Sequence, residues 1–130
     1  MWRAGREPLQ GFRIFRLGLN PERSALYERI NRRAIHMFHA GLVKETRSLL
    51  EAYGEKTHPL ESLGYKQALQ LIRGESDEAA AIREAQQAHR NYAKRQMTWF
   101  RREPDVAWLE GFGDEKAVQQ TAMELVKKQL

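Results

Sequence analysis

The feature that most constrains the fold is the 26-residue run from Asp77 to Arg102, which contains neither glycine nor proline. A run of this length without a helix breaker predicts one helix of about 39 Å, at 1.5 Å per residue. We expect Ser76 and Asp77 to cap its start, and Glu103-Pro104 to end it. The rest of the chain is therefore expected to be organised around this helix.

The C-terminal half of this predicted helix separates apolar from basic side chains. At about 100° per residue, each class occupies its own arc. The apolar arc consists of Tyr92, Ala93, Met97, Trp99 and Phe100, and the basic arc of Arg90, Lys94, Arg95, Arg101 and Arg102. We expect the apolar arc to pack in the core. Gln96 lies in its middle and needs a hydrogen-bond partner there, because an unpaired buried amide costs roughly 1–3 kcal/mol.

The charge of the chain is concentrated in the same segment. Residues 90–102 contain five Lys or Arg and no acid, and the whole chain has a net charge of +5. A basic stripe beside aromatic residues is typical of proteins that bind a nucleic-acid backbone. The alternative is an ordinary solvated helix face, which composition alone slightly favours because such faces are common.

Length and composition predict one modest domain, 1–130, with 42% hydrophobic residues. There is no cysteine, and His36 and His39 are more typical of packing or surface positions than of zinc ligands. No apolar run approaches 18 residues and no signal peptide is present, so we expect a cytoplasmic protein without a membrane span. The start, Met1 to Pro8, reads like a loop entered midway, and we expect a piece of a longer protein.

Two short strands and four further helices are predicted around the long helix, giving a mainly α fold. The strands are 12–19 and 106–109, and the helices are 21–40, 42–53, 62–74 and 114–129. Asn20 and Asp114 are the expected caps of the first and last of these helices. Tyr53 is expected to belong to the buried stripe of helix 42–53, and Val126 to the buried stripe of helix 114–129.

Two positions suit anion binding, and each also has a purely structural explanation. Arg33 falls inside the apolar arc of helix 21–40, where a guanidinium usually has an anionic partner. The residues alone favour a carboxylate of the fold over a bound phosphate. Gly64, at the start of helix 62–74, permits close approach of a backbone to the amide donors there. Tight helix packing explains Gly64 about equally well.

No phosphate-binding loop, dinucleotide fingerprint or serine elbow occurs, so no catalytic centre is predicted. Longer motifs carry more information. Leu63-Gly64-Tyr65-Lys66-Gln67, then Tyr92 to Arg101, then Trp108-Leu109, closely resemble the C-terminal part of bacterial tRNA dimethylallyltransferases, also called tRNA isopentenyltransferases. The segments 26–33, 37–41 and 44–50 are similar to the same family in the same order. The resemblance covers roughly residues 3–110.

The resemblance implies a magnesium-dependent transfer of the dimethylallyl group from dimethylallyl diphosphate to the exocyclic amine of the adenosine 3′ of the anticodon. It also implies an α/β, P-loop-kinase-like enzyme that draws the target base out of its stack. The family's P-loop, general-base aspartate and sheet lie upstream of the matched residues. We therefore expect no catalytic residue here, magnesium held mainly by the upstream half, and no activity from this chain alone.

Residue by residue, the resemblance places tRNA contacts in two segments. They are Glu61, Ser62, Leu63, Gly64, Tyr65 and Lys66, and then Lys94, Arg95, Gln96, Met97, Thr98, Trp99, Phe100 and Arg101. The cations would meet phosphates. Tyr65 or Trp99 would stack on a splayed base, worth about 1–3 kcal/mol, although Trp99 is more typical of a core residue. Gln96 would be satisfied by the RNA or by a neighbouring loop. Arg33 and Arg47 are nominated for the diphosphate.

The expected partners are a tRNA anticodon stem-loop and, for the full enzyme, dimethylallyl diphosphate, with no membrane. We expect the full enzyme to be monomeric and a piece of it to self-associate through the surface that the remainder would cover. The alternative is a stand-alone helical RNA- or DNA-binding module without catalysis. The start at Met1 to Pro8 favours the enzyme.

Overall fold

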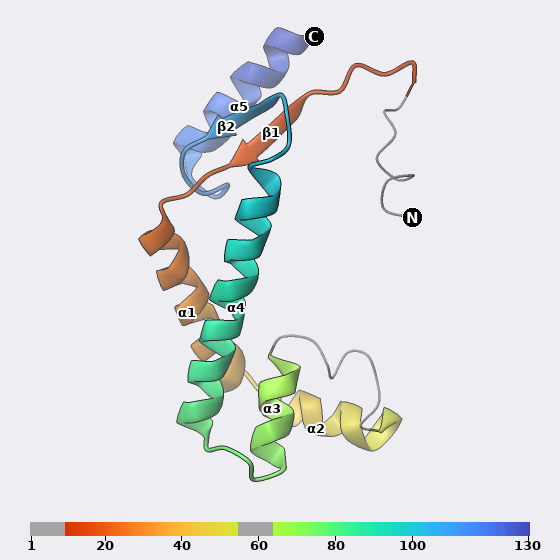
Figure 1. The fold of residues 1–130 in the computed structure, drawn as a ribbon, viewed down its shortest axis with the longest axis vertical. Helices are drawn as coiled ribbons and strands as arrows, with labels where there is room; N and C mark the ends of the chain where they lie inside the picture. Colours follow the sequence, from red (N-terminus) through yellow and green to blue (C-terminus); the bar gives the residue numbers. More distant parts are fainter. Residues whose placement is uncertain (1–9, 55–63) are drawn as a thin grey trace. The chain divides into compact units, whose positions relative to one another are not determined.

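The computed structural model describes residues 10–54 and 64–130. Its elements are, in chain order, β1 (Arg16–Leu19), α1 (Arg23–His39), α2 (Leu42–Tyr53), α3 (Tyr65–Ile72), α4 (Glu78–Phe100), β2 (Val106–Leu109) and α5 (Lys116–Gln129) (Figure 1). The prediction of a mainly helical chain with two short strands is confirmed. None of the described helices is long and apolar enough to cross a lipid bilayer.

The chain divides into two compact units, whereas the sequence analysis expected one. The first unit joins the described residues 10–21 to Pro104–Leu130 and contains β1, β2 and α5. The second unit spans Glu22–Glu103 and contains α1 to α4. All the described residues with a predicted binding role belong to the second unit.

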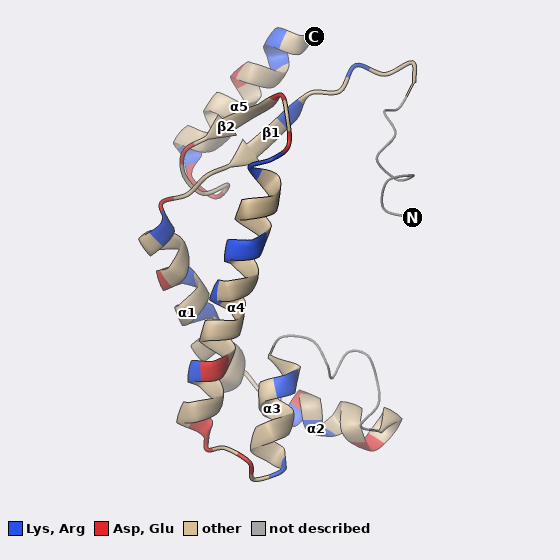
Figure 2. Ribbon diagram, viewed as in Figure 1, with Lys and Arg blue, Asp and Glu red and all other residues tan. Residues whose placement is uncertain are grey.

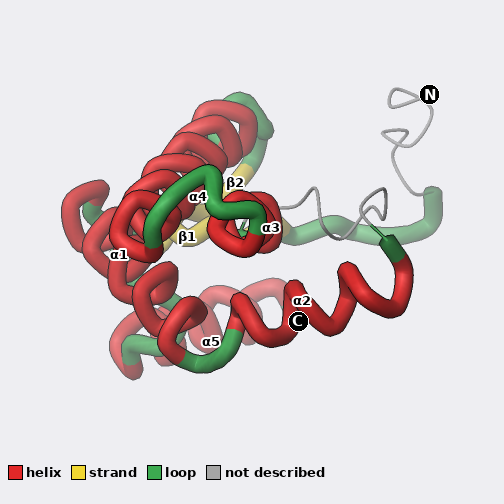
Figure 3. Tube along the Cα trace, turned by 90° about the horizontal axis from the view of Figure 1, so that it is seen from below, coloured by secondary structure: helices red, strands yellow, loops and turns green. Residues whose placement is uncertain are grey.

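The core of the second unit lies where its four helices meet. α4 packs against α1 and α3, and α2 packs against α3 (Figure 3). Ala34 of α1 and Ala81 and Ala85 of α4 are at most 1% exposed, and such small side chains let helix backbones approach closely. The remaining buried members of this cluster are Phe38, Leu42 and Ala68.

The long helix begins as predicted. The Asp77 side chain accepts a hydrogen bond from the Ala80 backbone N–H at 2.7 Å, and α4 then runs for 23 residues. This cap satisfies one of the amide donors that a helix start leaves free. The bounds of α2 are also those predicted, with Gly41 before it and Gly54 after it, both at positive φ.

In the first unit, β1 and β2 form a parallel pair. Arg16 is opposite Val106, and the register continues to Leu19 opposite Leu109. The predicted strand 12–19 was too long at its start, because the four residues of β2 can pair with only four residues of β1. A Cβ on Gly18 would lie 2.5 Å from the Trp108 ring, so glycine makes room for this ring beside the strand.

Both predicted helix caps outside α4 were wrong. Asn20 extends the strand pairing instead, because its N–H donates to the Leu109 carbonyl at 2.8 Å and its side-chain amide donates to Glu110 at 3.0 Å. The N-cap of α1 is Glu22. The N-cap of α5 is Glu115 and not Asp114, and its carboxylate accepts the Phe112 N–H at 3.1 Å.

Two predicted core residues are exposed, namely Tyr53 at the end of α2 and Val126 in α5. The predicted helix 62–74 is observed as α3, Tyr65–Ile72, with Gly64 as its N-cap. Residues 62 and 63 lie outside the described residues.

Candidate nucleic-acid interface

The two halves of α4 differ in how they are covered. In the N-terminal half, Ala81 and Ala85 are buried, whereas no residue after Arg90 in this helix is fully buried. After Arg90, the half-buried positions of α4 are Ala93 and Met97, which continue from Gln86 and Arg90 at three- and four-residue steps. The other side chains after Arg90 in this helix are exposed and therefore open to a partner.

Lys94, Arg95, Arg101 and Arg102 are all exposed. Within 10–54 and 64–130, none of these four cations forms an ion pair with a carboxylate. The acids of α4 are confined to its N-terminal half, while basic residues continue toward its C-terminal end (Figure 2). The surface formed by these four cations, which we call the α4 basic surface, can attract a polyanion.

Arg90 has a different environment from the other basic residues of its predicted arc. It is half-buried, and its Nη1 donates to the Asn31 side-chain oxygen of α1 at 2.6 Å. Gln86 donates to the Asn31 backbone carbonyl at 3.1 Å. Arg90 therefore helps to hold α1 against α4. The prediction that it belongs to the exposed basic arc was wrong.

The aromatic residues of the predicted apolar arc are not buried. Tyr92 is 47% exposed, Phe100 44% and Trp99 37%, and the last two meet edge to face with centroids 4.8 Å apart. The expectation that these rings pack in the core was wrong, because the half-buried stripe passes beside them. Gln96 is also exposed, so water can bond its amide, and the expected partner from the RNA or a neighbouring loop is not required.

Arg95 and Tyr92 lie one helical turn apart and interact. The guanidinium carbon of Arg95 is 5.9 Å from the centroid of the Tyr92 ring, at the outer limit of a cation–π contact. Thr98 uses its hydroxyl locally, because it donates to the Lys94 carbonyl at 2.9 Å.

The start of α3 is shaped by Gly64 and Gln67. Gly64 is buried with φ +91°, and a Cβ there would lie 3.2 Å from the Met37 methyl group. Its N–H donates to the Gln67 side chain at 2.9 Å. The backbone angle and the close packing both account for glycine at this position, and this amide is already paired.

Tyr65 and Lys66 follow at the first turn of α3. The Tyr65 hydroxyl donates to Glu45 of α2 at 2.7 Å, and this bond, with burial and the negative charge of Glu45, raises the pKa of Tyr65 above 10.0. Lys66 is exposed. The other three predicted contacts, Glu61, Ser62 and Leu63, lie outside the described residues.

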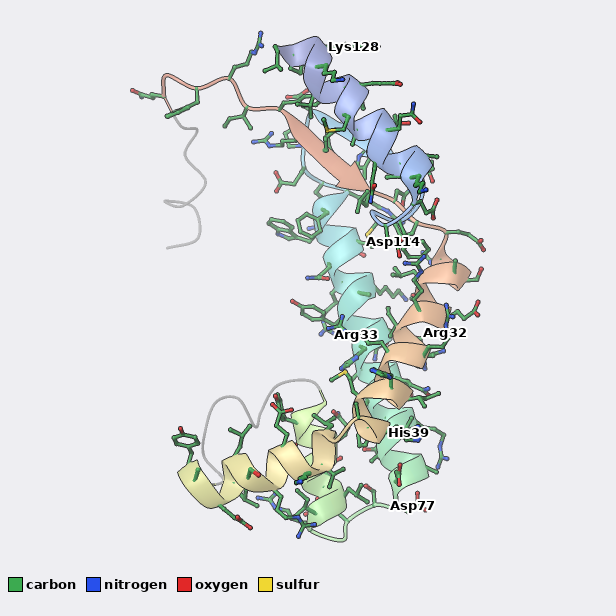
Figure 4. All side chains as sticks on the ribbon, turned by 180° about the vertical axis from the view of Figure 1, so that it is seen from behind. Arg32, Arg33, His39, Asp77, Asp114 and Lys128 are labelled. Atoms are coloured by element: carbon green, nitrogen blue, oxygen red, sulfur yellow. The ribbon has the colours of Figure 1, made fainter. Side chains whose placement is uncertain are left out.

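Arg33 and Arg47 are exposed on α1 and α2, respectively. The carboxylate partner favoured for Arg33 is not found among the described residues. Arg33 lies on the side of α1 toward α4, and Arg32 lies on the other side (Figure 4).

His89 and Asn31 were missed by the sequence analysis. Burial, and to a lesser extent the charge of Arg33, lower the pKa of His89 below 6.5. Its Nε2 is buried and has no hydrogen-bond partner in the described part of the chain. A signal for Asn31 was available, because it precedes Ala34 and Phe38 at three- and four-residue steps and is thus a polar residue on the packing face.

No group of three or more His, Cys, Asp or Glu residues that could hold a metal ion occurs within the described ranges. These residues therefore give no geometry for the magnesium that the resemblance implies.

Comparison with known proteins gives consistent matches. A family model described as IPP transferase matches residues 1–103. The chain is 59% identical over 127 residues to a tRNA dimethylallyltransferase of Koribacter versatilis, covering 98% of this chain and 41% of that protein. It is 50% identical over 125 residues to a tRNA dimethylallyltransferase of Solibacter usitatus, covering 95% of this chain and 41% of that protein.

Two solved structures are similar to the chain. One is a tRNA isopentenylpyrophosphate transferase of Bacillus halodurans, with a TM-score of 0.77, 31% identity, and coverage of 88% of this chain and 38% of that one. The other is a tRNA delta(2)-isopentenylpyrophosphate transferase of Staphylococcus epidermidis, with a TM-score of 0.75, 30% identity, and coverage of 87% and 38%. The chain thus spans 38–41% of the length of these four relatives.

Proposed function

This chain belongs to the IPP transferase family, and we propose that it is the tRNA-contacting C-terminal portion of a tRNA dimethylallyltransferase. The proposed reaction joins the exocyclic amine nitrogen of the adenosine 3′ of the anticodon to C1 of the dimethylallyl group. The bond from C1 to the diphosphate oxygen breaks, diphosphate leaves, and the amine loses a proton. The names of the similar proteins support transfer of a dimethylallyl group to tRNA. The adenosine and its amine are what the family resemblance implies.

The observation that carries the proposal is the α4 basic surface. Lys94, Arg95 and Arg101 are exposed and have no carboxylate partner in the described ranges. Binding of phosphates to such cations is favourable because it releases the counterions of the RNA, and it weakens as salt rises. Phosphate contacts of this kind position an RNA without reading its sequence.

A second contact is proposed at the start of α3. Lys66 is exposed there, and the Tyr65 ring is held by the hydroxyl bond to Glu45. Both are proposed to meet the anticodon stem-loop. The remaining proposed contacts from the resemblance are Gln96, Met97, Thr98, Trp99 and Phe100 on α4, Gly64 on the α3 side, and Glu61, Ser62 and Leu63 outside the described residues.

Arg33 and Arg47 are proposed for the diphosphate side of the reaction. A guanidinium presents paired N–H donors to phosphate oxygens and keeps its charge at any physiological pH. Arg33 suits this role because it is exposed and has no carboxylate partner among the described residues. Magnesium remains an expectation of the resemblance, and no step through it is derived.

We propose that the described residues bind RNA and do not carry out the transfer by themselves. A tRNA partner also leads us to propose a cytoplasmic location.

The proposed function is tested by the affinity of the full 130-residue chain for a fluorescent anticodon stem-loop RNA over a series of salt concentrations. Lys94→Gln, Arg95→Gln and Arg101→Gln should each weaken binding. Each should also reduce the slope of log affinity against log salt by about 0.7–0.9 if one phosphate contact is lost. Lys127→Gln, which replaces an exposed lysine of α5, is the matched control. It should change neither the affinity nor its dependence on salt.

Equal losses in the α4 variants and in the Lys127→Gln control would show diffuse charge attraction and contradict the proposal. A DNA hairpin of the same sequence separates the two functional alternatives. Clear preference for RNA supports the tRNA enzyme, whereas equal binding of RNA and DNA supports a general nucleic-acid module.

A further inference from the structure

One stripe of α4 passes from the core to solvent along the helix. Ala81, Ala85, Tyr92 and Trp99 follow one another at steps of four, seven and seven residues, and they therefore share a face. The two alanines are at most 1% exposed, whereas Tyr92 and Trp99 are 47% and 37% exposed. The face that forms the core near the start of α4 thus presents aromatic side chains at its other end.

Tyr92 is the ring on this exposed part of the face that lies next to a cation. Arg95 lies over it at 5.9 Å, and both side chains are exposed. A cation above a ring is attracted by its negative π-face. Tyr92 is therefore an exposed aromatic surface beside a positive charge.

The surroundings of Tyr92 indicate which kind of partner fits. Residues 90–102 contain five basic residues and no acid. A run of cations without an acid favours an anionic partner. A single-stranded nucleic acid combines flat bases with a phosphate at every step, and it complements both the ring and the cations.

We propose that Tyr92 stacks on an unpaired nucleobase of the bound RNA, with Arg95 beside the ring and Lys94 and Arg101 on flanking phosphates. The inference rests on the proposed function and adds to it a residue that the family resemblance did not assign to RNA contact. Only an unpaired base presents its face, because the bases of a duplex are stacked on one another. The partner is therefore the loop of a stem-loop and not its stem.

The test uses the full chain and an anticodon stem-loop RNA that carries the fluorescent base 2-aminopurine at one loop position at a time. Tyr92→Leu removes the ring and keeps an apolar side chain of good helix propensity. It should weaken binding by about 5- to 150-fold, the range that corresponds to truncation of a stacking aromatic residue. Stacking carries no charge, so the slope of log affinity against log salt should not change.

Three further measurements make the inference specific. Tyr92→Phe keeps the ring and should bind within about twofold of the unaltered chain, because stacking does not need the hydroxyl. Tyr53→Leu replaces another exposed tyrosine, on α2, and should bind like the unaltered chain. The 2-aminopurine fluorescence of at least one loop position should fall on binding, and this fall should be lost in Tyr92→Leu.

The outcomes separate the inference from the proposed function. If Tyr92→Leu binds as tightly as the unaltered chain and quenches every loop position equally well, stacking on Tyr92 is refuted while tRNA binding by the α4 basic surface stands. If Tyr92→Phe is as weak as Tyr92→Leu, the ring is not the recognised group and the inference also fails. If the unaltered chain binds no stem-loop RNA at low salt, both proposals are overturned.

Discussion

Replacing Asn31 by alanine should destabilise the second unit, Glu22–Glu103, because Asn31 accepts the only described hydrogen bond of the Arg90 guanidinium. The bond is short, at 2.6 Å, and its donor is charged and half-buried. The second bond to Asn31, from Gln86, reaches its backbone carbonyl and survives the substitution. The change thus removes one charge-assisted bond and leaves the rest of the contact in place.

The expected magnitude follows from two opposing terms. A hydrogen bond to a charged group contributes about 1.5–3 kcal/mol. Alanine is a better helix former than asparagine by roughly 0.6 kcal/mol, which offsets part of the loss. The free energy of unfolding should therefore fall by about 1–2 kcal/mol. Asn31→Asp keeps the acceptor oxygen and adds an opposite charge, so it should be at least as stable as the unaltered chain.

Urea unfolding followed by circular dichroism at 222 nm measures the effect, because the unit containing Asn31 carries four of the five described helices. A double-mutant cycle with Arg90→Met isolates the pair from the change in helix propensity and should return a coupling of about 1.5–3 kcal/mol. Arg90→Met should also leave the salt dependence of RNA binding unchanged. Additive losses in the cycle, or a reduced salt slope in Arg90→Met, would refute the structural role of Arg90.

Three other substitutions test local features of the same unit. Gly64→Ala should cost at least about 1 kcal/mol in urea unfolding, because φ is +91° and the new methyl would lie 3.2 Å from Met37; a neutral result would contradict this backbone geometry. The pKa of His89 is lower in the folded chain than in the unfolded chain, so neutral His89 contributes to the stability of the fold above pH 6.5. This contribution is lost as pH falls through the folded-state pKa. His89→Gln should therefore lose less stability on acidification than the unaltered chain. The pKa of Tyr65 is raised in the folded chain, so the contribution of its protonated hydroxyl to stability is present below pH 10.0 and is lost above it. Tyr65→Phe should remove this loss of stability at alkaline pH. An unchanged dependence of stability on pH in either variant would rule out the corresponding pKa shift.

Local signals accounted for the elements that the sequence predicted well. The run without glycine or proline and the Asp77 cap define α4, and Gly41 and Gly54 mark the ends of α2. These signals act within a few residues, so no knowledge of the tertiary structure is needed to use them.

Features set by distant partners were predicted less well. The length of β1 depends on how much of β2 is available to pair with it. Asn20 and Asp114 have the chemistry of helix caps, but Asn20 is engaged by Leu109 and Glu110, about ninety residues later, and Glu115 takes the cap of α5. A cap prediction from sequence cannot see such competing partners.

In the candidate site, too, local features were predicted well and features set by distant residues were not. Helical periodicity correctly separated basic from aromatic positions on α4, but it could not tell where the packing stripe would leave a ring uncovered. Tyr92 and Trp99 are exposed for this reason, and Arg90 is withdrawn from the basic surface by Asn31 of another helix. The assignment of tRNA contacts remains a prediction.

Photo-crosslinking of the full chain to an anticodon stem-loop that carries 4-thiouridine in its loop tests the central claim most directly. Peptide mapping by mass spectrometry then identifies the contacted residues. We predict crosslinks within residues 91–102, which are the C-terminal part of α4 and the two arginines after it, with a second group at Tyr65 and Lys66. These crosslinks should be lost as salt rises. Crosslinks confined to α5, Lys116–Gln129, or spread evenly over exposed lysine-containing segments, would contradict it.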